Sequence, residues 1–334
     1  MNQGPATSPL NTMADVWEAY RQELEAVEIQ VQKNLDSSVA LVNTVAAHIL
    51  SSGGKRIRPL LLVLSARLCG YGGTDDRLLA SLVEYIHTAT LLHDDVVDDA
   101  DLRRGRPTAR RVWGNQISIL VGDYLYSKAI CRIVGFKNQG INELLSEACR
   151  KMAEGEVLQL YYNGNPGITE AEYLRIVSYK TAGLIAASCG IGAIVGNASS
   201  AQQDALFQFG EHIGTAFQLI DDTLDYAANG THLGKSIGQD LRQGKTTLPL
   251  LHLLQHCSEQ DRQMIKDRME TRTLTDEDLV RIVELMREYG SIAYAADRAS
   301  AYVVAANRDL ECFEESSAKR ALGIVAEYMV HRDR

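Results

Sequence analysis

Hydrophobic positions recur at a spacing of three to four residues along nearly the whole 334-residue chain. Because residues three and four apart lie on one face of a helix, this spacing predicts ten or more amphipathic α-helices. Strand-like alternation is nearly absent. Apolar residues between Val16 and Leu35 show this spacing, and a second example is the apolar face that comprises Leu79, Leu82, Val83, Ile86, Ala89 and Leu92. The pattern therefore predicts an all-α fold.

The chain carries no composition change that would mark a linker, and no repeat of the length typical of solenoids. We therefore expect one large helical domain over residues 14–334, preceded by a flexible tail at 1–13. The tail is polar, contains Pro5 and Pro9, and lacks the basic-then-apolar order of a signal peptide. Residues 182–198 come closest to a membrane span, but their repeated glycines favour a tightly packed buried helix.

Two short acidic clusters with the same spacing change this picture. They comprise Asp94, Asp95 and Asp98, and Asp221, Asp222 and Asp225. On a helix each cluster would share one face. Crowded carboxylates repel one another and are costly to desolvate, unless a divalent cation, alone or with phosphate, lies between them. An all-oxygen set indicates Mg²⁺, which is often shared with substrate phosphates. A solvated acidic face is the alternative, and the repetition argues against it.

Charge and cysteine content narrow the class of protein. The net charge of −9 and the pI of about 5.4 argue against a nucleic-acid partner. The six cysteines are scattered without a CxxC pair, which is typical of reduced thiols in a cytoplasmic protein. Any membrane contact would be peripheral. The chain has neither a Walker loop nor a GxSxG elbow, so neither a nucleotide nor a serine nucleophile is indicated.

Basic residues accompany the acidic clusters. Residues 53–59 place three cations in a glycine-bounded turn before a helix that we expect to begin near Pro59, an arrangement suited to phosphate. Arg103 and Arg104 follow Asp98 by one to two helical turns and could contact a metal-bridged anion. A basic loop and a surface salt-bridge patch remain the alternatives. Three lysines and a histidine add weaker signals, since each alone could be ordinary or structural; they are Lys180, Lys235, Lys245 and His87.

In this combination and order, the motifs resemble those of the trans-type isoprenyl diphosphate synthases, most closely the bacterial octaprenyl (long-chain polyprenyl) diphosphate synthases. The resemblance runs from about residue 51 to the C-terminus. The matching motifs are GGKRIRP (53–59), EYIHTATLLHDDVVDDADLRRGRPT (84–108), LVGDYLYSKA (120–129), EGEVLQL (154–160), KTA (180–182), GTAFQLIDDTLDY (214–226), LGKSIGQDL (233–241) and GKTTLPL (244–250).

This resemblance implies a helical bundle around a deep central cavity, usually as a homodimer. It also implies a prenyltransferase that condenses isopentenyl diphosphate with an allylic diphosphate, such as farnesyl diphosphate. The product would be an all-trans polyprenyl diphosphate, octaprenyl in length, for quinone side chains. Both aspartate motifs would bind Mg²⁺, three ions per active site. The leaving group would be contacted by Arg103, Lys180 and Lys235, with Gln218 nearby, and Thr181 and Lys245 would also bind substrate. The diphosphate of isopentenyl diphosphate would be bound by Lys55, Arg58, His87 and Arg104.

Product length has a candidate determinant on the first-motif helix. A growing tail leaving the metal site would run back along this helix, each i+4 step covering about 6 Å. The residues on this path are Ile86, Ala89 and Thr90. The floor could lie on a helix over residues 120–134, where the candidates are Tyr126, Ile130 and Ile133. The small residues on the path could equally serve helix packing.

Four other functions compete with this one. The same chemistry could end at geranylgeranyl, heptaprenyl or solanesyl diphosphate. A terpene cyclase has no need for the second-substrate cations at 53–59. A non-catalytic partner subunit would tend to lose the aspartates or the basic motif, and here both are intact. A passive acidic cation buffer would leave the basic motifs unexplained.

Overall fold

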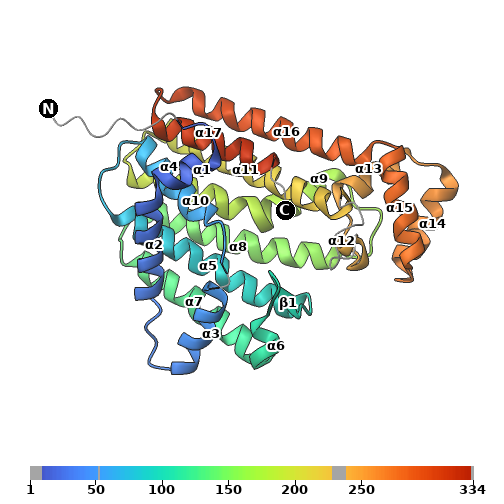
Figure 1. Ribbon diagram of the computed structural model, residues 1–334, viewed down its shortest axis with the longest axis horizontal. Helices are drawn as coiled ribbons and strands as arrows, with labels where there is room; N and C mark the ends of the chain where they lie inside the picture. The colour runs from blue at the N-terminus through green and yellow to red at the C-terminus, as the bar shows by residue number, and fades with distance from the viewer. Residues whose placement is uncertain (1–9, 52, 228–237, 332–334) are drawn as a thin grey trace. The chain divides into compact units, whose positions relative to one another are not determined.

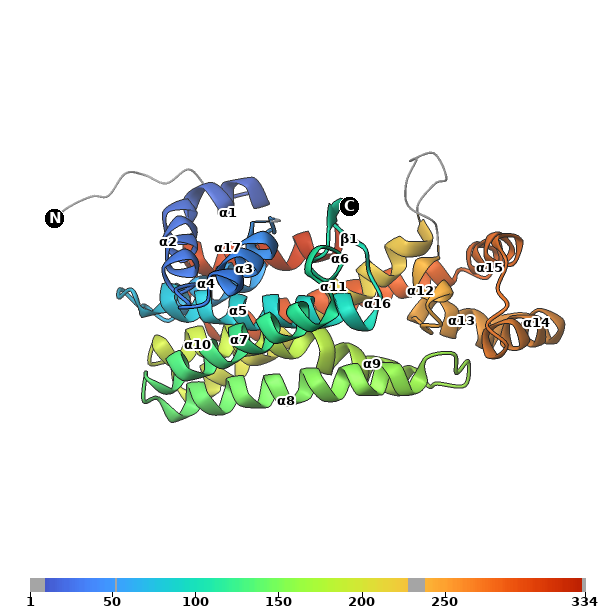
Figure 2. The same ribbon diagram turned by 90° about the horizontal axis from the view of Figure 1, so that it is seen from below.

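The computed structural model describes residues 10–51, 53–227 and 238–331, and the chain forms two compact units. The first unit contains residues 1–149, 187–207 and 313–324. The second contains residues 150–186, 208–312 and 325–334. Helices dominate both units (Figures 1 and 2), so the predicted all-α fold class is confirmed.

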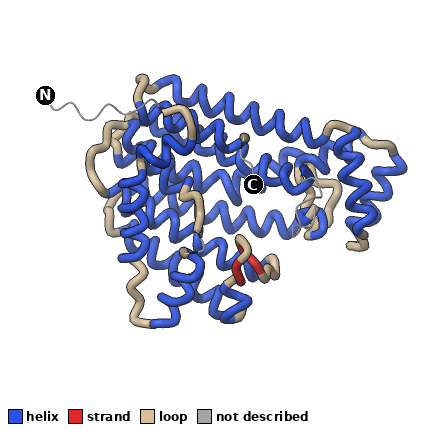
Figure 3. The backbone as a smooth tube through the Cα atoms, in the orientation of Figure 1, coloured by secondary structure: helices blue, strands red, loops and turns tan. Residues whose placement is uncertain are grey.

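The chain up to residue 149 builds most of the first unit. Its elements are α1 (Met13–Ala19), α2 (Arg21–Lys33), α3 (Ala40–Leu50), α4 (Ile57–Leu68), α5 (Asp75–Val97), β1 (Leu102–Arg103), β2 (Arg106–Pro107), α6 (Ala109–Trp113), α7 (Asn115–Val134) and the start of α8 (Gln139–Tyr162). The two short strands form the only sheet in the described part of the chain, and Figure 3 shows them in red.

The rest of α8 and the elements after it build the second unit, although α10, α11 and α17 contribute residues to both units. These elements are α9 (Glu170–Val177), the π-helical turn η1 (Ser178–Ala182), α10 (Gly183–Val195), α11 (Ser200–Ala227), α12 (Gln239–Arg242), α13 (Leu248–His256), α14 (Glu259–Glu270), α15 (Asp276–Glu288), α16 (Ser291–Asp309), the 3₁₀ turn η2 (Leu310–Cys312) and α17 (Ser317–Val330).

Capping residues fix several helix starts. Thr12, Thr169 and Thr275 each accept a backbone N–H three residues later, and an acidic side chain at that position binds back to the threonine N–H. Such reciprocal capping satisfies amide groups that a helix start leaves unpaired. Leu10 and Met13 are buried, so residues 10–13, which were expected to belong to a flexible tail, pack against the protein.

Helix α5 is the centre of the first unit. It packs against α2, α4 and α7, and these helices lie together in Figures 1 and 2. Every residue of its predicted apolar face, from Leu79 to Leu92, is buried, so that face is confirmed. Helix α4 is buried throughout its middle, over residues 59–66. The helix carrying the first aspartate motif is therefore held on several sides.

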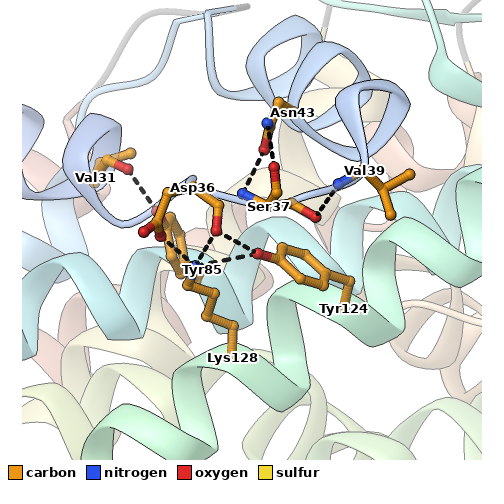
Figure 4. A network of polar contacts seen from close by, with 8 residues as sticks. All are labelled: Val31, Asp36, Ser37, Val39, Asn43, Tyr85, Tyr124 and Lys128. Atoms are coloured by element: carbon orange, nitrogen blue, oxygen red, sulfur yellow. Dashed lines mark hydrogen bonds and ion pairs between the residues drawn. The ribbon is translucent and has the colours of Figure 1, made fainter.

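The end of α2 and the loop after it contact both α5 and α7 (Figure 4). The Tyr85 hydroxyl on α5 donates to the Val31 carbonyl oxygen at 2.5 Å. On α7, the Lys128 ammonium donates to the carbonyl oxygen of Asp36 at 2.8 Å and to its carboxylate at 2.5 Å. The Tyr124 hydroxyl also reaches the Asp36 carbonyl, at 3.3 Å. These bonds fix the middle of α5 to the last turn of α2, and the middle of α7 to the loop that follows α2.

A separate apolar core supports the second aspartate motif. Helix α13 packs against α9, α15 and α16, which lie near one another in Figure 1. Tyr226, at the end of α11, is completely buried in this core. The other buried members are Leu241, Leu250, Leu253, Leu254, Cys257, Ile265, Met269, Leu279, Ile282, Val283, Leu285 and Met286. The buried Tyr226 thus fixes the chain directly after Asp225, the last aspartate of the second motif.

The most apolar helical stretch is a core element. Residues 170–195 are long and apolar enough to cross a membrane by length and composition, but 83% of the apolar window is buried inside the protein. Within the first unit, a Cβ atom added to Gly192 would lie 2.4 Å from the Leu62 carbonyl oxygen, so only glycine allows this approach of α10 to α4. The predicted tightly packed buried helix is confirmed.

Candidate active site

The first aspartate motif lies at the end of α5. The helix ends at Val97, and the N–H of Asp98 donates to the Asp94 carbonyl oxygen at 2.8 Å. Asp95 is only 1% exposed, and its carboxylate accepts Nε–H of Arg103 at 2.8 Å. Burial raises the pKa of Asp95, and the nearby Arg103 opposes that rise. Asp94 and Asp98 remain half-buried beside this pair.

The two arginines after the motif lie on a hairpin, so the prediction that helical turns carry them is wrong. Leu102 pairs with Pro107 and Arg103 with Arg106. Between the strands, Arg104 and Gly105 have φ values of 52° and 74°. Positive φ at both central positions is the geometry of the tight turn that matches strand twist. Arg103 lies on the first strand of this hairpin, and from there its guanidinium contacts Asp95.

Three further contacts secure this hairpin within the first unit. The His48 ring donates through Nε2 to the Pro107 carbonyl oxygen at 2.9 Å. Arg106 donates to the Ser51 carbonyl oxygen at 3.2 Å. The Thr108 hydroxyl donates to the Ala100 carbonyl oxygen at 2.7 Å. The hairpin is therefore fixed to the segment that leads into α4.

The predicted cations for a second anion gather in the same unit. A Cβ atom added to Gly54 would lie 3.1 Å from the Arg104 guanidinium, so that arginine packs against the glycine turn. Burial lowers the pKa of His87 well below its ordinary value, and the charges of Arg58 and Arg104 lower it further. The Nε of Arg58 is buried without a hydrogen-bond partner among the described residues. A neutral imidazole and several guanidinium groups thus surround one place.

Arg56 has a structural role that the sequence did not reveal. It donates to Glu84 at 2.5 Å and to the Leu50 carbonyl oxygen at 3.0 Å, and it also pairs with Glu28. Its φ of 47° turns the chain into α4, which begins at Ile57, two residues before the expected start. Proline is tolerated there because the first turn of a helix needs no N–H partner. Lys55 is exposed on the same turn.

The second motif is built differently, around a buried carboxylate. Asp221 is exposed, whereas Asp222 is 7% exposed. The Tyr173 hydroxyl donates to Oδ2 of Asp222 at 2.6 Å, and the Gln218 amide donates to Oδ1 at 2.7 Å. The Thr181 hydroxyl donates to the other end of Gln218 at 2.8 Å. The structure therefore brings together Thr181, Gln218 and Asp222, three of the residues proposed from the sequence.

Close helix contacts create this arrangement. A Cβ atom added to Gly214 on α11 would lie 2.6 Å from Cα of Ala182, and one added to Gly155 on α8 would lie 2.9 Å from the Lys180 backbone nitrogen. Both glycines thus press against the π-helical turn η1. Turns of this kind are rare and re-aim the side chains they carry. Here the turn carries Lys180 and Thr181.

Lysines and further carboxylates complete the surroundings. The Lys180 ammonium donates to Glu156 at 2.8 Å and to Gln159 at 3.0 Å. Lys245 lies 3.4 Å from the Asp240 carboxylate, and the Asp240 N–H donates to Asp225 at 2.9 Å. The predicted residue Lys235 lies outside the described residues.

These side chains line one cavity within the second unit, with a volume of about 170 Å³. It is lined by Gln159, Tyr162, Asn163, Ile168, Tyr173, Ile176, Val177, Lys180, Thr181, Gln218, Asp221, Asp222, Asp240, Lys245, Thr246 and Thr247. Cations and hydroxyl groups from several elements thus meet the second motif in a cavity large enough for a small anion.

Three residues that bind predicted site residues were missed by the sequence analysis: Glu156, Tyr173 and Asp240. Glu156 and Asp240 lie inside recognised motifs, EGEVLQL and LGKSIGQDL, so the motif membership was a usable signal. Tyr173 lies in no motif, and its partner Asp222 is 49 residues away. Nothing in the local pattern distinguishes it from a core tyrosine.

The oxygen-rich donor set fits a divalent cation. Burial raises the pKa of Asp222 to about 7, and the neighbouring Asp240 and Asp221 contribute, while its two hydrogen-bond donors oppose the rise. A cation would relieve this crowding of carboxylates. Among the described residues, no three acidic, histidine or cysteine side chains are gathered closely enough to hold a metal by themselves. The set therefore suits an ion that shares substrate oxygens and water.

The residues predicted to set product length lie on α5 and α7 in the first unit. Ile86 and Ala89 are completely buried, and Thr90 is half-buried. On α7, Ile133 is 2% exposed and Tyr126 is 36% exposed. These positions are compatible with helix packing as well as with a tail path, so the path stays a prediction.

Comparison with known proteins identifies the family. Residues 39–286 match the polyprenyl synthetase family. The chain is 41% identical to the octaprenyl diphosphate synthase of Escherichia coli over 94% of its own length and 97% of that protein. It superposes with a TM-score of 0.92 on a decaprenyl diphosphate synthase from Rhodobacter capsulatus, at 38% identity, over 96% of this chain and 99% of that one.

A third relative bears on the metal. The polyprenyl synthase of Caulobacter crescentus, crystallised with calcium and isoprenyl diphosphate, superposes with a TM-score of 0.91 at 37% identity, over 97% of this chain and 99% of that one. The family is metal-dependent, in agreement with the all-oxygen donor set. The predictions of family and of prenyltransferase activity are confirmed, and the chain belongs to the polyprenyl synthetase family.

Proposed function

We propose that the protein condenses isopentenyl diphosphate with an allylic diphosphate, such as farnesyl diphosphate, and repeats the step to make a long all-trans polyprenyl diphosphate. The observation that carries this proposal is the presence of two different anion-binding arrangements. The first unit holds guanidinium groups around a neutral histidine, and the second holds lysines and hydroxyl groups around a carboxylate cluster. Two diphosphate substrates need two such places.

In the first unit, we assign the diphosphate of isopentenyl diphosphate to Lys55, Arg58, His87 and Arg104. The buried Nε of Arg58 has no protein partner among the described residues, and leaving a buried donor unpaired is costly. A phosphate oxygen would supply the missing acceptor. Because His87 stays neutral, its ring can donate to phosphate without adding to the positive charge.

In the second unit, we assign the allylic diphosphate to Lys180, Thr181, Gln218 and Lys245, with Lys235 outside the described residues. Arg103 would contact the same leaving group from the first motif. In the structure Lys180 is bound by Glu156 and Gln159. Because its side chain is long and rotatable, its ammonium could exchange these partners for phosphate oxygens.

Both aspartate motifs would hold Mg²⁺, three ions per active site, against the allylic diphosphate. The bound ions would neutralise negative charge that develops on the departing diphosphate. The protein residues then have three tasks. They orient the isopentenyl double bond beside the allylic carbon as its C–O bond breaks. They exclude water that would quench the carbocation. They leave the final proton to the released diphosphate, so no dedicated protein base is needed.

We propose a product near eight isoprene units, because the full-length relative from E. coli is named for an octaprenyl product and matches at 41% identity. Small side chains at Ala89 and Thr90 leave room for such a tail beside α5. Heptaprenyl or longer products would require only a different floor on α7. A homodimer in the cytoplasm, with peripheral membrane contact for product release, and a single domain from residue 14 complete the proposal.

The test is turnover of labelled isopentenyl diphosphate with farnesyl diphosphate and Mg²⁺, with products resolved by length. We expect Asp94→Ala and Asp221→Ala each to lower turnover by several orders of magnitude while the circular dichroism spectrum is unchanged. Asp204→Ala is the matched control, because it removes an exposed aspartate from α11 outside the motif. Near-normal turnover in either motif variant would remove that aspartate from the mechanism.

A further inference from the structure

The second aspartate motif depends on a residue outside every motif that resembles the family. We propose that Tyr173 is a positioning residue for the allylic diphosphate site, and that its hydroxyl orients Asp222 and, through Gln218, the hydroxyl of Thr181. The inference rests on the proposed function of the cavity in the second unit. It assigns a role to α9, a helix to which the sequence analysis gave no role in the chemistry.

The first step is the contact between Tyr173 and Asp222. The tyrosine is 5% exposed and the aspartate 7% exposed, so bulk water has little access to either. Their oxygens lie 2.6 Å apart, a distance typical of charge-assisted hydrogen bonds. Removing the hydroxyl would leave a buried carboxylate oxygen without its donor, which costs more than losing a solvent-exposed bond.

The second step is the continuation of this contact across α11. Gln218 donates to the other oxygen of Asp222 at 2.7 Å, and it accepts from the Thr181 hydroxyl at 2.8 Å. An amide that donates at one end and accepts at the other has only one orientation. Donors on both oxygens also prevent rotation of the carboxylate. The four side chains therefore form one relay from α9 through α11 to η1.

The third step is the place of the relay. All four side chains line the cavity of about 170 Å³ that also contains Lys180 and Asp221. Loss of the Tyr173 hydroxyl would let Asp222 rotate, and Gln218 and Thr181 would then lose their fixed positions. A small misplacement of groups that hold a substrate lowers the rate strongly. Tyr173 would thus act on the allylic diphosphate without touching it.

The chain offers a matched control for Tyr173. The Tyr294 hydroxyl on α16 also donates to a carboxylate, at 2.9 Å, and this tyrosine is not among the residues that line the cavity. Its partner is Glu170, the first residue of α9. Each tyrosine therefore binds a carboxylate of the second unit, but only Tyr173 is bound to the aspartate motif.

The experiment compares Tyr173→Phe with Tyr294→Phe in the full chain. Calorimetric titration with inorganic pyrophosphate in the presence of Mg²⁺ measures anion binding without turnover. Steady-state assays give KM and kcat for farnesyl and isopentenyl diphosphate separately. For Tyr173→Phe we expect pyrophosphate affinity and kcat/KM for farnesyl diphosphate to fall about 10-fold or more. KM for isopentenyl diphosphate should stay within about twofold, and Tyr294→Phe should match the wild type in all three measurements.

Equal losses in the two tyrosine variants, or no loss in either, would overturn the proposal. If Tyr173→Phe does not fold, Gln218→Ala tests the relay from its other side, and unchanged pyrophosphate affinity in that variant overturns it. The proposed function can fail independently of the relay. Wild-type protein that binds pyrophosphate but incorporates no isopentenyl diphosphate would refute the synthase activity. The pyrophosphate titrations would still test the relay.

Discussion

Substitution of Gly214 by alanine tests how closely α11 must approach the π-helical turn. The added Cβ atom would lie 2.6 Å from Cα of Ala182 and 2.9 Å from its Cβ atom. The optimal distance between non-bonded carbon atoms is about 3.5–4.0 Å, so α11 must move away by about 1 Å. The obstacle is backbone and not the end of a flexible side chain, which means that the helix itself must shift.

Two effects on stability oppose each other in this variant. Overpacking costs about 1–3 kcal/mol, whereas alanine is favoured over glycine inside a helix by about 1 kcal/mol. The net loss of unfolding free energy should therefore be small, about 0–2 kcal/mol. The effect on the site should be larger. Gln218 lies one turn further along α11, and its 2.8 Å bond to Thr181 would break. Misplacement by 1 Å can cost about 100-fold in rate.

The assay is incorporation of labelled isopentenyl diphosphate, combined with thermal melting of the same samples. Gly140→Ala on α8 is the control, because a Cβ atom there would meet the end of the Ile194 side chain at 3.3 Å, which can move aside. We expect wild-type activity and equal or higher stability for the control. Gly214→Ala with activity within about twofold of the wild type would show that the close approach does not position the site.

Two further predictions concern the first unit. Ala89→Phe or Thr90→Tyr should shorten the product, because an aromatic ring would block the path beside α5; unchanged product length in both variants would refute that path. The pKa of His87 is lowered first by burial and then by Arg58. Below its ordinary value of 6.5, the unfolded chain takes up a proton that the folded chain does not, so folding stability falls as the pH falls. His87→Gln should make this fall shallower between pH 6.5 and 5, by up to about 1 kcal/mol per pH unit. The measurement is urea denaturation of both proteins at several pH values. The same pH dependence of the unfolding free energy in the variant and the wild type would contradict the prediction.

The sequence predicted those parts of the site that repeat or lie within one helix. The period along α5 correctly placed the apolar face, and the shared spacing of the two aspartate motifs indicated a metal. The hairpin at Arg104 was missed because strands of two residues show no alternation, and a charged residue with positive φ has no local signature. Tyr173 was missed because a single side chain whose partner is 49 residues away looks like any core tyrosine. The roles of Arg56 and Glu84 likewise depend on contacts between distant segments.

The end of α5 has an electrostatic consequence for folding. A helix carries partial negative charge at its C-terminus, and here the last turn has no basic residue. Instead Asp94, Asp95 and Asp98 add three carboxylates, and Arg103 on the hairpin contacts one of them, Asp95. The last turn should therefore fray more readily than the rest of α5. A divalent cation would stabilise that turn by linkage, so amide hydrogen exchange at the end of α5 should slow when metal and diphosphate bind. Substrate binding and ordering of the last turn of α5 would then be thermodynamically coupled.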